Sequence, residues 1–286
     1  MASKNHQSDH PSPVILITGS SSGIGLDTAR YFSKKGWHVI ATCRKAADVK
    51  RMQKEGLSSF QLDYEDQASL DAVVPRLQKL TGGRIDVLFN NGAYAVPCLT
   101  EDLPTPALRQ IFEANFFGWH DLTRQILPLM FAAGKGRIIH NSSVLGFAAM
   151  RARGAYNATK FALEGLTDTM RQEIAGTNVD LILVQPGPIR TRIRENAHIQ
   201  FKKWISWKES RNPDFYTKGL IPRLSAENPE KDLFELMPDA VTRAVWHAAT
   251  ARRPKLRYRI TWATKIMAVA KRILSTRLMD RFASRF

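Results

Sequence analysis

The sequence predicts a doubly wound α/β fold, in which helices cover both faces of a single, mostly parallel sheet. Short apolar runs alternate with helical patterns along most of the chain, as is typical of such sheets. A glycine-rich turn follows the first of these runs. With 286 residues, 44% of them hydrophobic and 24% charged, the chain has the length and composition of one globular domain with a sizeable core.

The expected strands are short runs rich in apolar and β-branched residues. They stand at residues 14–17, 37–42, 59–62, 85–89, 136–141 and 179–185, with a further short run at 256–261. Helical spacing predicts helices at residues 26–35, 68–80, 108–131 and 155–174, and one more opening at Pro238. The first helix is expected to stop at Gly36, after a basic last turn.

The chain divides into four expected segments. Residues 1–13 are a polar, flexible lead, and residues 14–262 form the domain. Within the domain the regular pattern breaks down over residues 192–237, which predicts a substrate lid, with ordinary packing of its aromatics as the alternative. These aromatics are Phe201, Trp204, Trp207, Phe215 and Tyr216. Residues 263–286 form a basic tail.

Cysteine usage and hydropathy indicate a compartment. The two cysteines, Cys43 and Cys98, lie far apart without the spacing of a metal or redox pair, so both are expected to be reduced. The lead lacks the apolar centre of a signal peptide, and no stretch reaches the length of a membrane span. We therefore expect a cytoplasmic protein. Because the histidines are scattered, no metal site is expected.

The glycine-rich turn Thr18-Gly19-Ser20-Ser21-Ser22-Gly23-Ile24-Gly25 stands between the first strand and the first helix. Glycines let the backbone approach a diphosphate closely, and the helix offers free amides and the positive end of its dipole. This strand-to-helix context predicts a dinucleotide site. The residues expected to line it are Gly19, Ser21, Ser22, Gly23, Ile24 and Gly25.

Further motifs lie at or after the expected strands. Asn90-Asn91-Gly92-Ala93 follows one strand, and Pro186-Gly187-Pro188-Ile189-Arg190-Thr191 follows another. Tyr156 and Lys160 stand four residues apart in a helical segment, and Ser143 lies thirteen residues before the tyrosine at a strand end. Asn115 occurs in the run Ala-Asn-Phe-Phe-Gly.

In order and spacing, these motifs resemble the short-chain dehydrogenase/reductase family from about residue 14 to residue 191. The turn has the spacing Gly-x-x-x-Gly-x-Gly, and Asn90-Asn91-Gly92-Ala93 exchanges the last two residues of the family's Asn-Asn-Ala-Gly. The resemblance implies a Rossmann-type fold, a nicotinamide coenzyme, and a catalytic set of Asn115, Ser143, Tyr156 and Lys160. The coenzyme contacts that it implies are Asp63, Asn91, Gly92, Tyr156, Lys160, Pro186, Gly187, Ile189 and Thr191.

The chemistry of the reaction calls for these residue types. Tyr156 and Lys160 project to one helix face, so the ammonium group is expected near the phenol and should lower its pKa from about 10 toward the working pH. Tyr156 would then give a proton to a carbonyl oxygen, or take it back. Ser143 would hydrogen-bond the same oxygen. The resemblance implies that Lys160 also binds the nicotinamide ribose and that Asn115 supports a proton-supplying water path.

The end of the second strand, Thr42-Cys43-Arg44-Lys45, bears on the choice of coenzyme. NAD enzymes place a carboxylate there for the ribose 2′-hydroxyl, but Thr42 and Cys43 carry none. Arg44 can pair with a 2′-phosphate through its planar fork, helped by Ser22 and Lys45. NADP(H) is therefore the expected cofactor, with Arg44 as a plain solvated charge the alternative.

Most of the positive charge lies in the C-terminal segment. From Ala251 to Phe286 there are eleven Lys or Arg and one acid, Asp280, which supplies +10 of the net charge of +16. Apolar residues recur among the cations at helical spacing, namely Ile266, Val269, Ala270, Ile273, Leu274 and Leu278. The tail therefore predicts an amphipathic helix, either peripheral to an anionic membrane or docked on its own domain or a sister subunit. No recognition motif accompanies the charge, so no nucleic-acid partner is expected.

Together these observations predict an NADP(H)-dependent oxidoreductase that reduces an aldehyde or ketone, apolar ones preferred, or runs the reverse reaction. The run Ser143-Val144-Leu145-Gly146 resembles the NADP-dependent branch of 17β-hydroxysteroid and retinol dehydrogenases and bacterial aldehyde reductases. Family habit implies a homo-oligomer acting on a small molecule. The alternatives are a non-catalytic NADP-sensing protein and a membrane-surface protein acting through its tail. The substrate itself does not follow from the fold.

Overall fold

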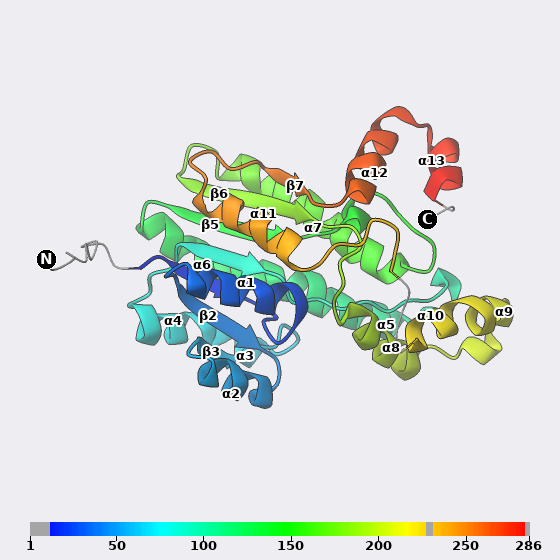
Figure 1. Cartoon of the computed structure of the whole chain (residues 1–286), viewed down its shortest axis with the longest axis horizontal. Coiled ribbons are helices and arrows are strands. Elements are labelled where there is room, and N and C mark those ends of the chain that lie inside the picture. Colours follow the sequence, from blue (N-terminus) through cyan, green and yellow to red (C-terminus); the bar gives the residue numbers. More distant parts are fainter. Residues whose placement is uncertain (1–11, 227–230, 284–286) are drawn as a thin grey trace, which may run out of the picture.

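The computed structural model describes residues 12–226 and 231–283 and confirms the doubly wound α/β fold (Figure 1). Seven strands, all paired in parallel, form one sheet in the order β3-β2-β1-β4-β5-β6-β7. The chain leaves β1 toward β3 and returns to place β4 on the other side of β1. This reversal creates a crevice at the carboxyl ends of β1 and β4, where such sheets bind ligands. The strands are β1 (Val14–Ile17), β2 (His38–Cys43), β3 (Ser58–Gln61), β4 (Val87–Asn90), β5 (Gly136–Asn141), β6 (Val179–Gln185) and β7 (Arg257–Arg259).

Helices cover both faces of the sheet. One face carries α1 (Gly23–Lys34), α2 (Ala46–Lys54) and α11 (Asp239–Thr250). The other carries α3 (Gln67–Asp71), α4 (Val73–Thr81), α6 (Gly118–Ala132) and α7 (Gly154–Glu173). Helix α5 (Thr105–Phe112) leads into α6 through a π-helical turn, η2 (Glu113–Phe117). Two apolar layers therefore sandwich the strands.

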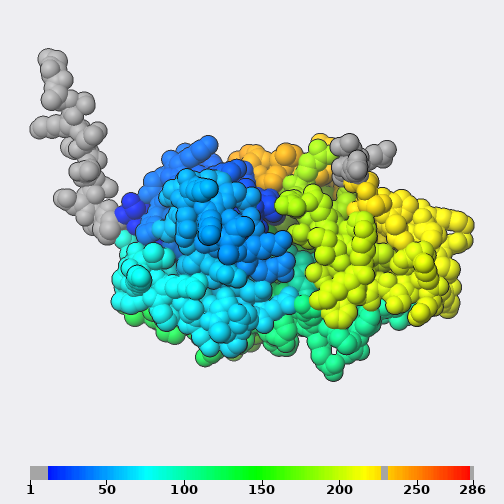
Figure 2. Space-filling model, turned by 90° about the horizontal axis from the view of Figure 1, so that it is seen from below, coloured from blue at the N-terminus to red at the C-terminus, as the bar shows by residue number. Residues whose placement is uncertain are grey.

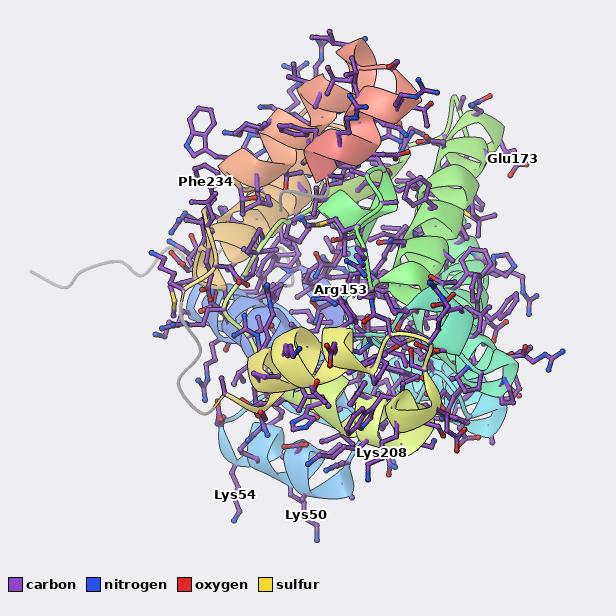
Figure 3. All side chains as sticks on the ribbon, turned by 90° about the vertical axis from the view of Figure 1, so that its right-hand side faces the viewer. Lys50, Lys54, Arg153, Glu173, Lys208 and Phe234 are labelled. Atoms are coloured by element: carbon purple, nitrogen blue, oxygen red, sulfur yellow. The ribbon has the colours of Figure 1, made fainter. Side chains whose placement is uncertain are left out.

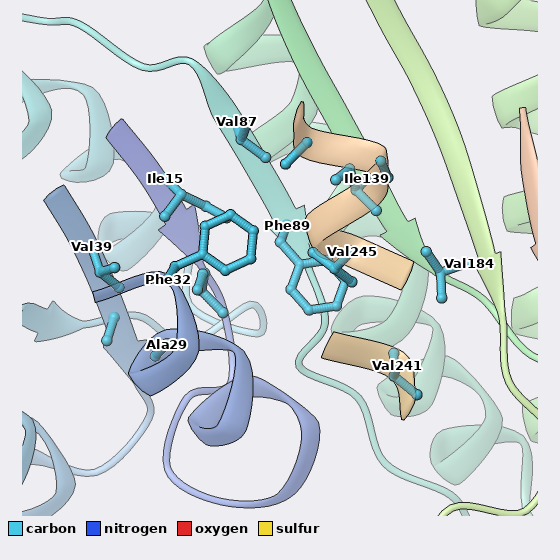
Figure 4. Close-up of a cluster of buried hydrophobic side chains, with 14 of the residues drawn as sticks. Ile15, Ala29, Phe32, Val39, Val87, Phe89, Ile139, Val184, Val241 and Val245 are labelled. Carbon is cyan, nitrogen blue, oxygen red and sulfur yellow. The ribbon is translucent and has the colours of Figure 1, made fainter. Parts of the chain in front are cut away.

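Successive residues of a strand point alternately into the two apolar layers. In β1, Ile15 and Ile17 join the cluster on the α1 and α11 side, whereas Val14 and Leu16 join the opposite one. Figure 4 shows Phe32 of α1 and Val245 of α11 among the strand side chains of the first cluster. Because both faces are buried, the central strands β1 and β4 are nearly continuous apolar runs, which is why the sequence reveals them clearly. The edge strands β3 and β7 are mostly polar.

The structure corrects three details of the expected helices. The helix expected at residues 68–80 is broken at Ala72, because Pro75 has no amide hydrogen and its ring clashes with a carbonyl one turn earlier. The helix expected at 108–131 contains η2. Helix α2, which is polar and mostly exposed, was not predicted.

The segment expected to be irregular, residues 192–237, is largely helical where it is described, and residues 227–230 lie outside the described ranges. It forms α8 (Ile193–Trp204), η4 (Trp207–Glu209), α9 (Pro213–Phe215), η5 (Tyr216–Leu220) and α10 (Ile221–Ser225). Ala197, Phe201 and Ile205 recur every four residues and are buried, so one helical signal was present but overlooked. Figure 2 shows this segment, in yellow-green and yellow, filling one end of the molecule beside the N-terminal half.

The tail forms two helices, α12 (Trp262–Ile273) and α13 (Thr276–Ala283). Met267 and Met279 are buried against a short turn, η3 (Val144–Gly146), so the tail contacts its own domain. No helix in the described part of the chain is long and apolar enough to cross a membrane. The ends of the expected lead and tail, residues 1–11 and 284–286, lie outside the described residues.

Candidate active site

The loops after β1 and β4 are tied together by Thr18. Its Oγ1 accepts hydrogen bonds from the backbone amides of Asn91, at 2.8 Å, and Gly92, at 3.2 Å. The Asn91 side chain adds a bond from Nδ2 to the Thr18 carbonyl at 3.0 Å and accepts one from Asn141 Nδ2 at 2.9 Å. The structure thus brings two predicted coenzyme motifs into contact, with the Asn91 amide group holding the glycine turn.

The three glycines of the turn occupy positions with no room for a side chain. Gly19 and Gly23 have φ values of +64° and +55°, which L side chains rarely adopt. A Cβ at Gly25 would lie 2.4 Å from the Gly19 carbonyl oxygen, and one at Gly23 would lie 3.0 Å from Thr191. Ile24 packs its side chain on the core beneath. This backbone cradle fits the diphosphate of a dinucleotide, as the spacing predicts.

Gly25→Ala is expected to damage both stability and coenzyme binding. Its new methyl group would meet backbone at Gly19, which cannot move aside as a flexible side chain can, so we expect a loss of about 1–3 kcal/mol in unfolding free energy. Thermal unfolding and coenzyme titration measure both effects. Gly165→Ala is the matched control, because Gly165 lies in α7 with nothing within 4 Å of a Cβ. Equal stability of the two variants would contradict the cradle.

The amino end of α1 is open to a ligand. Ser22 is the N-cap residue, but its hydroxyl makes no capping hydrogen bond. The backbone carbonyl of Ser21 accepts a 2.5 Å bond from the guanidinium of Arg51 in α2, which also pairs with Asp48 at 3.0 Å. Arg51 is a cation at the turn that sequence reasoning missed, because nothing in the sequence located α2.

The end of β2 presents Arg44 to solvent. Thr42 is buried and donates a hydrogen bond to the Ile17 carbonyl at 3.3 Å. Cys43 is buried as well, and burial raises the pKa of its thiol to about 11, so the thiol stays neutral. Arg44 and Lys45 are the first exposed residues after the strand. Asp63, beyond β3, is half-buried and accepts a bond from the Glu65 amide at 3.1 Å.

Tyr156, Lys160 and Ser143 are buried together at the carboxyl ends of β5 and β6. The Lys160 Nζ lies 5.6 Å from the centroid of the Tyr156 ring, as expected for side chains one helical turn apart. Ser143 Oγ accepts the Leu145 amide at 3.1 Å, and the Ser143 side chain lies near enough to the Tyr156 hydroxyl to lower the pKa of the phenol. The predicted trio is therefore assembled in one place.

The expected lowering of the tyrosine pKa is wrong for this structure. Burial raises the pKa of Tyr156 above its ordinary value, and the hydrogen bond from Ser143 offsets only part of that rise. Burial also lowers the pKa of Lys160 to about 7. Desolvation penalises the charged form of both groups, so the lysine is a weaker source of positive charge than the spacing alone suggested. Tyr156 is held as the neutral phenol.

Lys160 has two partners that sequence reasoning did not identify. Its Nζ donates to the Asn141 carbonyl at 2.9 Å and lies 4.0 Å from the centroid of the Trp119 ring. The Trp119 indole N–H in turn donates to the Gly92 carbonyl at 2.9 Å. Trp119 therefore links Lys160 to the loop after β4. Its place in a helix far along the chain gave no signal of this contact.

Asn115 lies in the π-helical turn η2, fully buried. Its Nδ2 donates to the Tyr94 carbonyl at 2.8 Å, and its Oδ1 accepts the Tyr94 amide at 3.1 Å. A weaker contact of 3.4 Å joins Nδ2 to Thr159 of α7. Asn115 thus fixes the chain after the β4 loop against the helix that carries Tyr156. π-Helical turns of this kind occur frequently at functional sites.

The loop after β6 closes the other side of the site. The Val144 amide donates to the Pro186 carbonyl at 2.8 Å, which joins this loop to the residue after Ser143. A Cβ at Gly187 would meet Thr261 Oγ1 at 2.2 Å, and Ile189 pairs with Leu236 in an isolated bridge. Through Thr191 the loop also reaches Gly23 of the glycine turn. Four predicted motifs therefore meet in one site: the glycine turn, the loop after β4, the set of Ser143, Tyr156 and Lys160, and the loop after β6.

One buried cluster contains Tyr156 together with residues of α8, α10 and η5. Tyr216 of η5 is fully buried, and its hydroxyl bonds to Asp102. The aromatics noted in the sequence join this cluster, which is formed in part by Phe201, Tyr216, Trp204, Trp207 and Phe215.

Comparison with known proteins agrees with this geometry. The family model described as short chain dehydrogenase matches residues 13–200. The chain belongs to the short-chain dehydrogenase family. Relatives include the uncharacterized oxidoreductase YbbO of Escherichia coli, 38% identical over 93% of this chain and 92% of its own, and an NADPH-dependent 3-dehydrocapnine reductase of Ornithobacterium rhinotracheale, 29% identical over 93% and 94%.

Among solved structures, a short-chain dehydrogenase from Streptomyces avermitilis superposes with a TM-score of 0.74 at 26% identity, covering 91% of this chain and 92% of that one. The chain is thus an oxidoreductase of the short-chain dehydrogenase family, and its fold is that of the family. Within the described residues, no group of His, Cys, Asp and Glu side chains is placed to hold a metal ion.

Proposed function

We propose that this short-chain dehydrogenase is an NADPH-dependent reductase of apolar aldehydes or ketones. The observation that carries the proposal is the buried Tyr156 phenol, which lies beside Ser143 and Lys160 at the edge of the sheet where the glycine turn opens. A protonated phenol at this position can give its proton to a carbonyl oxygen as hydride reaches the carbon.

The residues that would hold the coenzyme form a continuous path along the sheet edge. The glycine turn and the amino end of α1 fit the diphosphate, and Arg44 fits a ribose 2′-phosphate. Lys160 fits the nicotinamide-side ribose, with Asn91, Gly92 and the loop from Pro186 to Thr191 beside it. When bound, the nicotinamide ring supplies the hydride. The relative named as an NADPH-dependent reductase supports the choice of NADPH.

In this proposal Tyr156 donates its proton to the substrate oxygen while Ser143 holds that oxygen by a hydrogen bond. Two donors aimed at one oxygen stabilise the negative charge that develops there. Lys160 is buried against Trp119. Its ammonium group positions the Tyr156 phenol and stabilises the phenolate that forms as the proton leaves. Asn115 holds the chain after the β4 loop against α7.

The apolar cluster around Tyr156 suggests the substrate class. Helix α8, η5 and α10 contribute aromatic and aliphatic side chains to the buried cluster that contains Tyr156. An apolar aldehyde or ketone that reaches this cluster gains from each methylene that it buries, whereas a small polar substrate gains nothing there. We therefore propose that residues 192–237 act as the substrate lid.

A coenzyme and substrate panel tests the proposal. We expect oxidation of NADPH, followed at the nicotinamide absorption band, with long-chain or aromatic aldehydes and ketones, and a lower KM as the apolar part of the substrate grows. Small polar carbonyl compounds of equal reactivity are the controls. A protein that binds NADPH in a direct titration but reduces none of the panel would contradict the enzyme and favour a sensing role. Preference for NADH would contradict the coenzyme assignment.

A further inference from the structure

Helix α12 carries apolar residues on two opposite faces. Its docked face, with Thr264, Met267 and Ala268, is buried on the domain. Four other apolar residues are exposed, namely Trp262 at 65%, Ile266 at 38%, Val269 at 59% and Ile273 at 75%. Steps of four, three and four residues place them along one side of the helix, opposite the docked face. Contact with the domain therefore leaves this stripe uncovered.

Basic side chains flank the stripe. Lys265 and Arg272 lie beside it, and α12 and α13 together hold five Lys or Arg and one acid. The Lys265 Nζ lies 4.6 Å from the centroid of the Trp262 ring. Within the described residues, neither Lys265 nor Arg272 has an ion-pair partner. The exposed face therefore combines an apolar centre with free positive charge.

A basic groove of about 530 Å³ opens at the foot of α12, between β7 and α11. No acidic side chain among the described residues lines it. Arg243 and Arg257 are paired with carboxylates, which leaves Lys255, Arg259 and Lys265 facing the groove without an ion pair in the described structure. Leu236, 40% exposed, lines the same groove. The groove suits a phosphate-bearing headgroup next to an apolar layer.

We propose that α12 and this groove bind the surface of a membrane rich in anionic phospholipid. An in-plane helix with an apolar stripe, an interfacial tryptophan and flanking cations buries the stripe at the level of the acyl chains while its cations meet the headgroups. A second copy of the chain fits less well, because a twofold contact would bring the same cations face to face. Nucleic acid would leave the apolar stripe unused.

Vesicle binding tests the charge part of the proposal. The full chain is expected to sediment with vesicles of phosphatidylcholine and phosphatidylglycerol, but not with phosphatidylcholine alone. Lys265→Gln/Arg272→Gln is expected to weaken binding about 30-fold, at about 1 kcal/mol per basic side chain. The matched control is Lys50→Gln/Lys54→Gln, which removes the same charge from α2. In Figure 3 these lysines lie at the opposite end of the view from the tail helices.

Substitution in the stripe tests the apolar part. Ile273→Asn is expected to lower affinity for the anionic vesicles by about tenfold or more, because it removes a side chain that the bilayer would bury. Leu80→Asn is the control, since Leu80 is also exposed, at 41%, but lies in α4. Both variants are expected to keep the wild-type thermal unfolding temperature and reductase activity, so the outcome does not depend on the proposed function.

Three results would overturn the proposal. The first is an absence of binding to the anionic vesicles. The second is an equal loss of affinity for the anionic vesicles in the Lys50/Lys54 and Lys265/Arg272 variants. That result would mean that binding depends on the net charge of the protein and not on α12. The third is a dimer in sedimentation equilibrium that Ile273→Asn dissociates and that excludes the vesicles, which would show that a second copy covers the stripe.

Discussion

Tyr156→Phe is expected to lower kcat by about 10²–10⁴-fold, the usual contribution of a positioned general acid. The change removes one hydroxyl from a buried ring and leaves the apolar packing in place. Coenzyme affinity, measured by direct titration, is expected to stay near the wild-type value, because the hydroxyl faces Ser143 rather than the glycine turn. Single-turnover rates with NADPH and an apolar aldehyde give the measurement.

Tyr216→Phe is the matched control for this prediction. Tyr216 belongs to the same apolar cluster, but its hydroxyl accepts the Leu99 amide at 3.0 Å and bonds to Asp102, away from Ser143. We expect a small loss of stability and a rate close to that of the wild type. A Tyr156→Phe variant that keeps more than about a tenth of the wild-type rate would rule out the acid role.

The sequence was sufficient for the architecture because the sheet is buried on both faces. Val14–Ile17 and Val87–Asn90 are nearly continuous apolar runs, and the turns that follow them carry their own chemical signals. Helix α2 was missed because only Met52 is buried in it, so it has almost no apolar periodicity. Pro75 causes the break at Ala72. This local signal was concealed by the helical pattern on either side of the proline.

The sequence predicted those parts of the candidate site that depend on local backbone geometry or on a fixed spacing along one helix. The glycines of the turn and the four-residue spacing of Tyr156 and Lys160 act through local geometry, so position in the sequence was enough. Contacts between distant segments were not. The contacts of Trp119 with Lys160, of Thr18 with Asn91, and of Arg51 with the Ser21 carbonyl join helices and loops that are far apart in the sequence.

The pKa of Tyr156 was mispredicted for a related reason. Spacing shows that Lys160 is close, but burial of both groups decides which protonation states are favoured, and burial is a property of the whole fold. Desolvation by the apolar cluster opposes the charge of the lysine. The sign of the shift therefore required the packing around α7.

Arg44→Ala is expected to raise the dissociation constant for NADPH by roughly 10- to 150-fold and to leave that for NADH almost unchanged. A charge-assisted contact with the 2′-phosphate is worth about 1.5–3 kcal/mol, and NADH has no such phosphate. The structure sharpens this prediction. Thr42 and Cys43 point into the core, so Arg44 is the first side chain after β2 that can reach a ligand. Fluorescence titration of each reduced coenzyme gives the two constants.

Two further variants separate recognition of the phosphate from general charge. Lys50→Ala removes an exposed cation of α2 that contacts no predicted coenzyme motif, and it is expected to change neither constant. Arg51→Ala is expected to weaken both coenzymes together, because Arg51 is already engaged by Asp48 and holds the glycine turn through the Ser21 carbonyl. We therefore expect Arg44→Ala to weaken the binding of NADPH alone, Arg51→Ala to weaken the binding of both coenzymes, and Lys50→Ala to change neither. If Arg44→Ala instead weakens NADPH and NADH equally, Arg44 supports the turn as Arg51 does, and the assignment of NADP(H) fails.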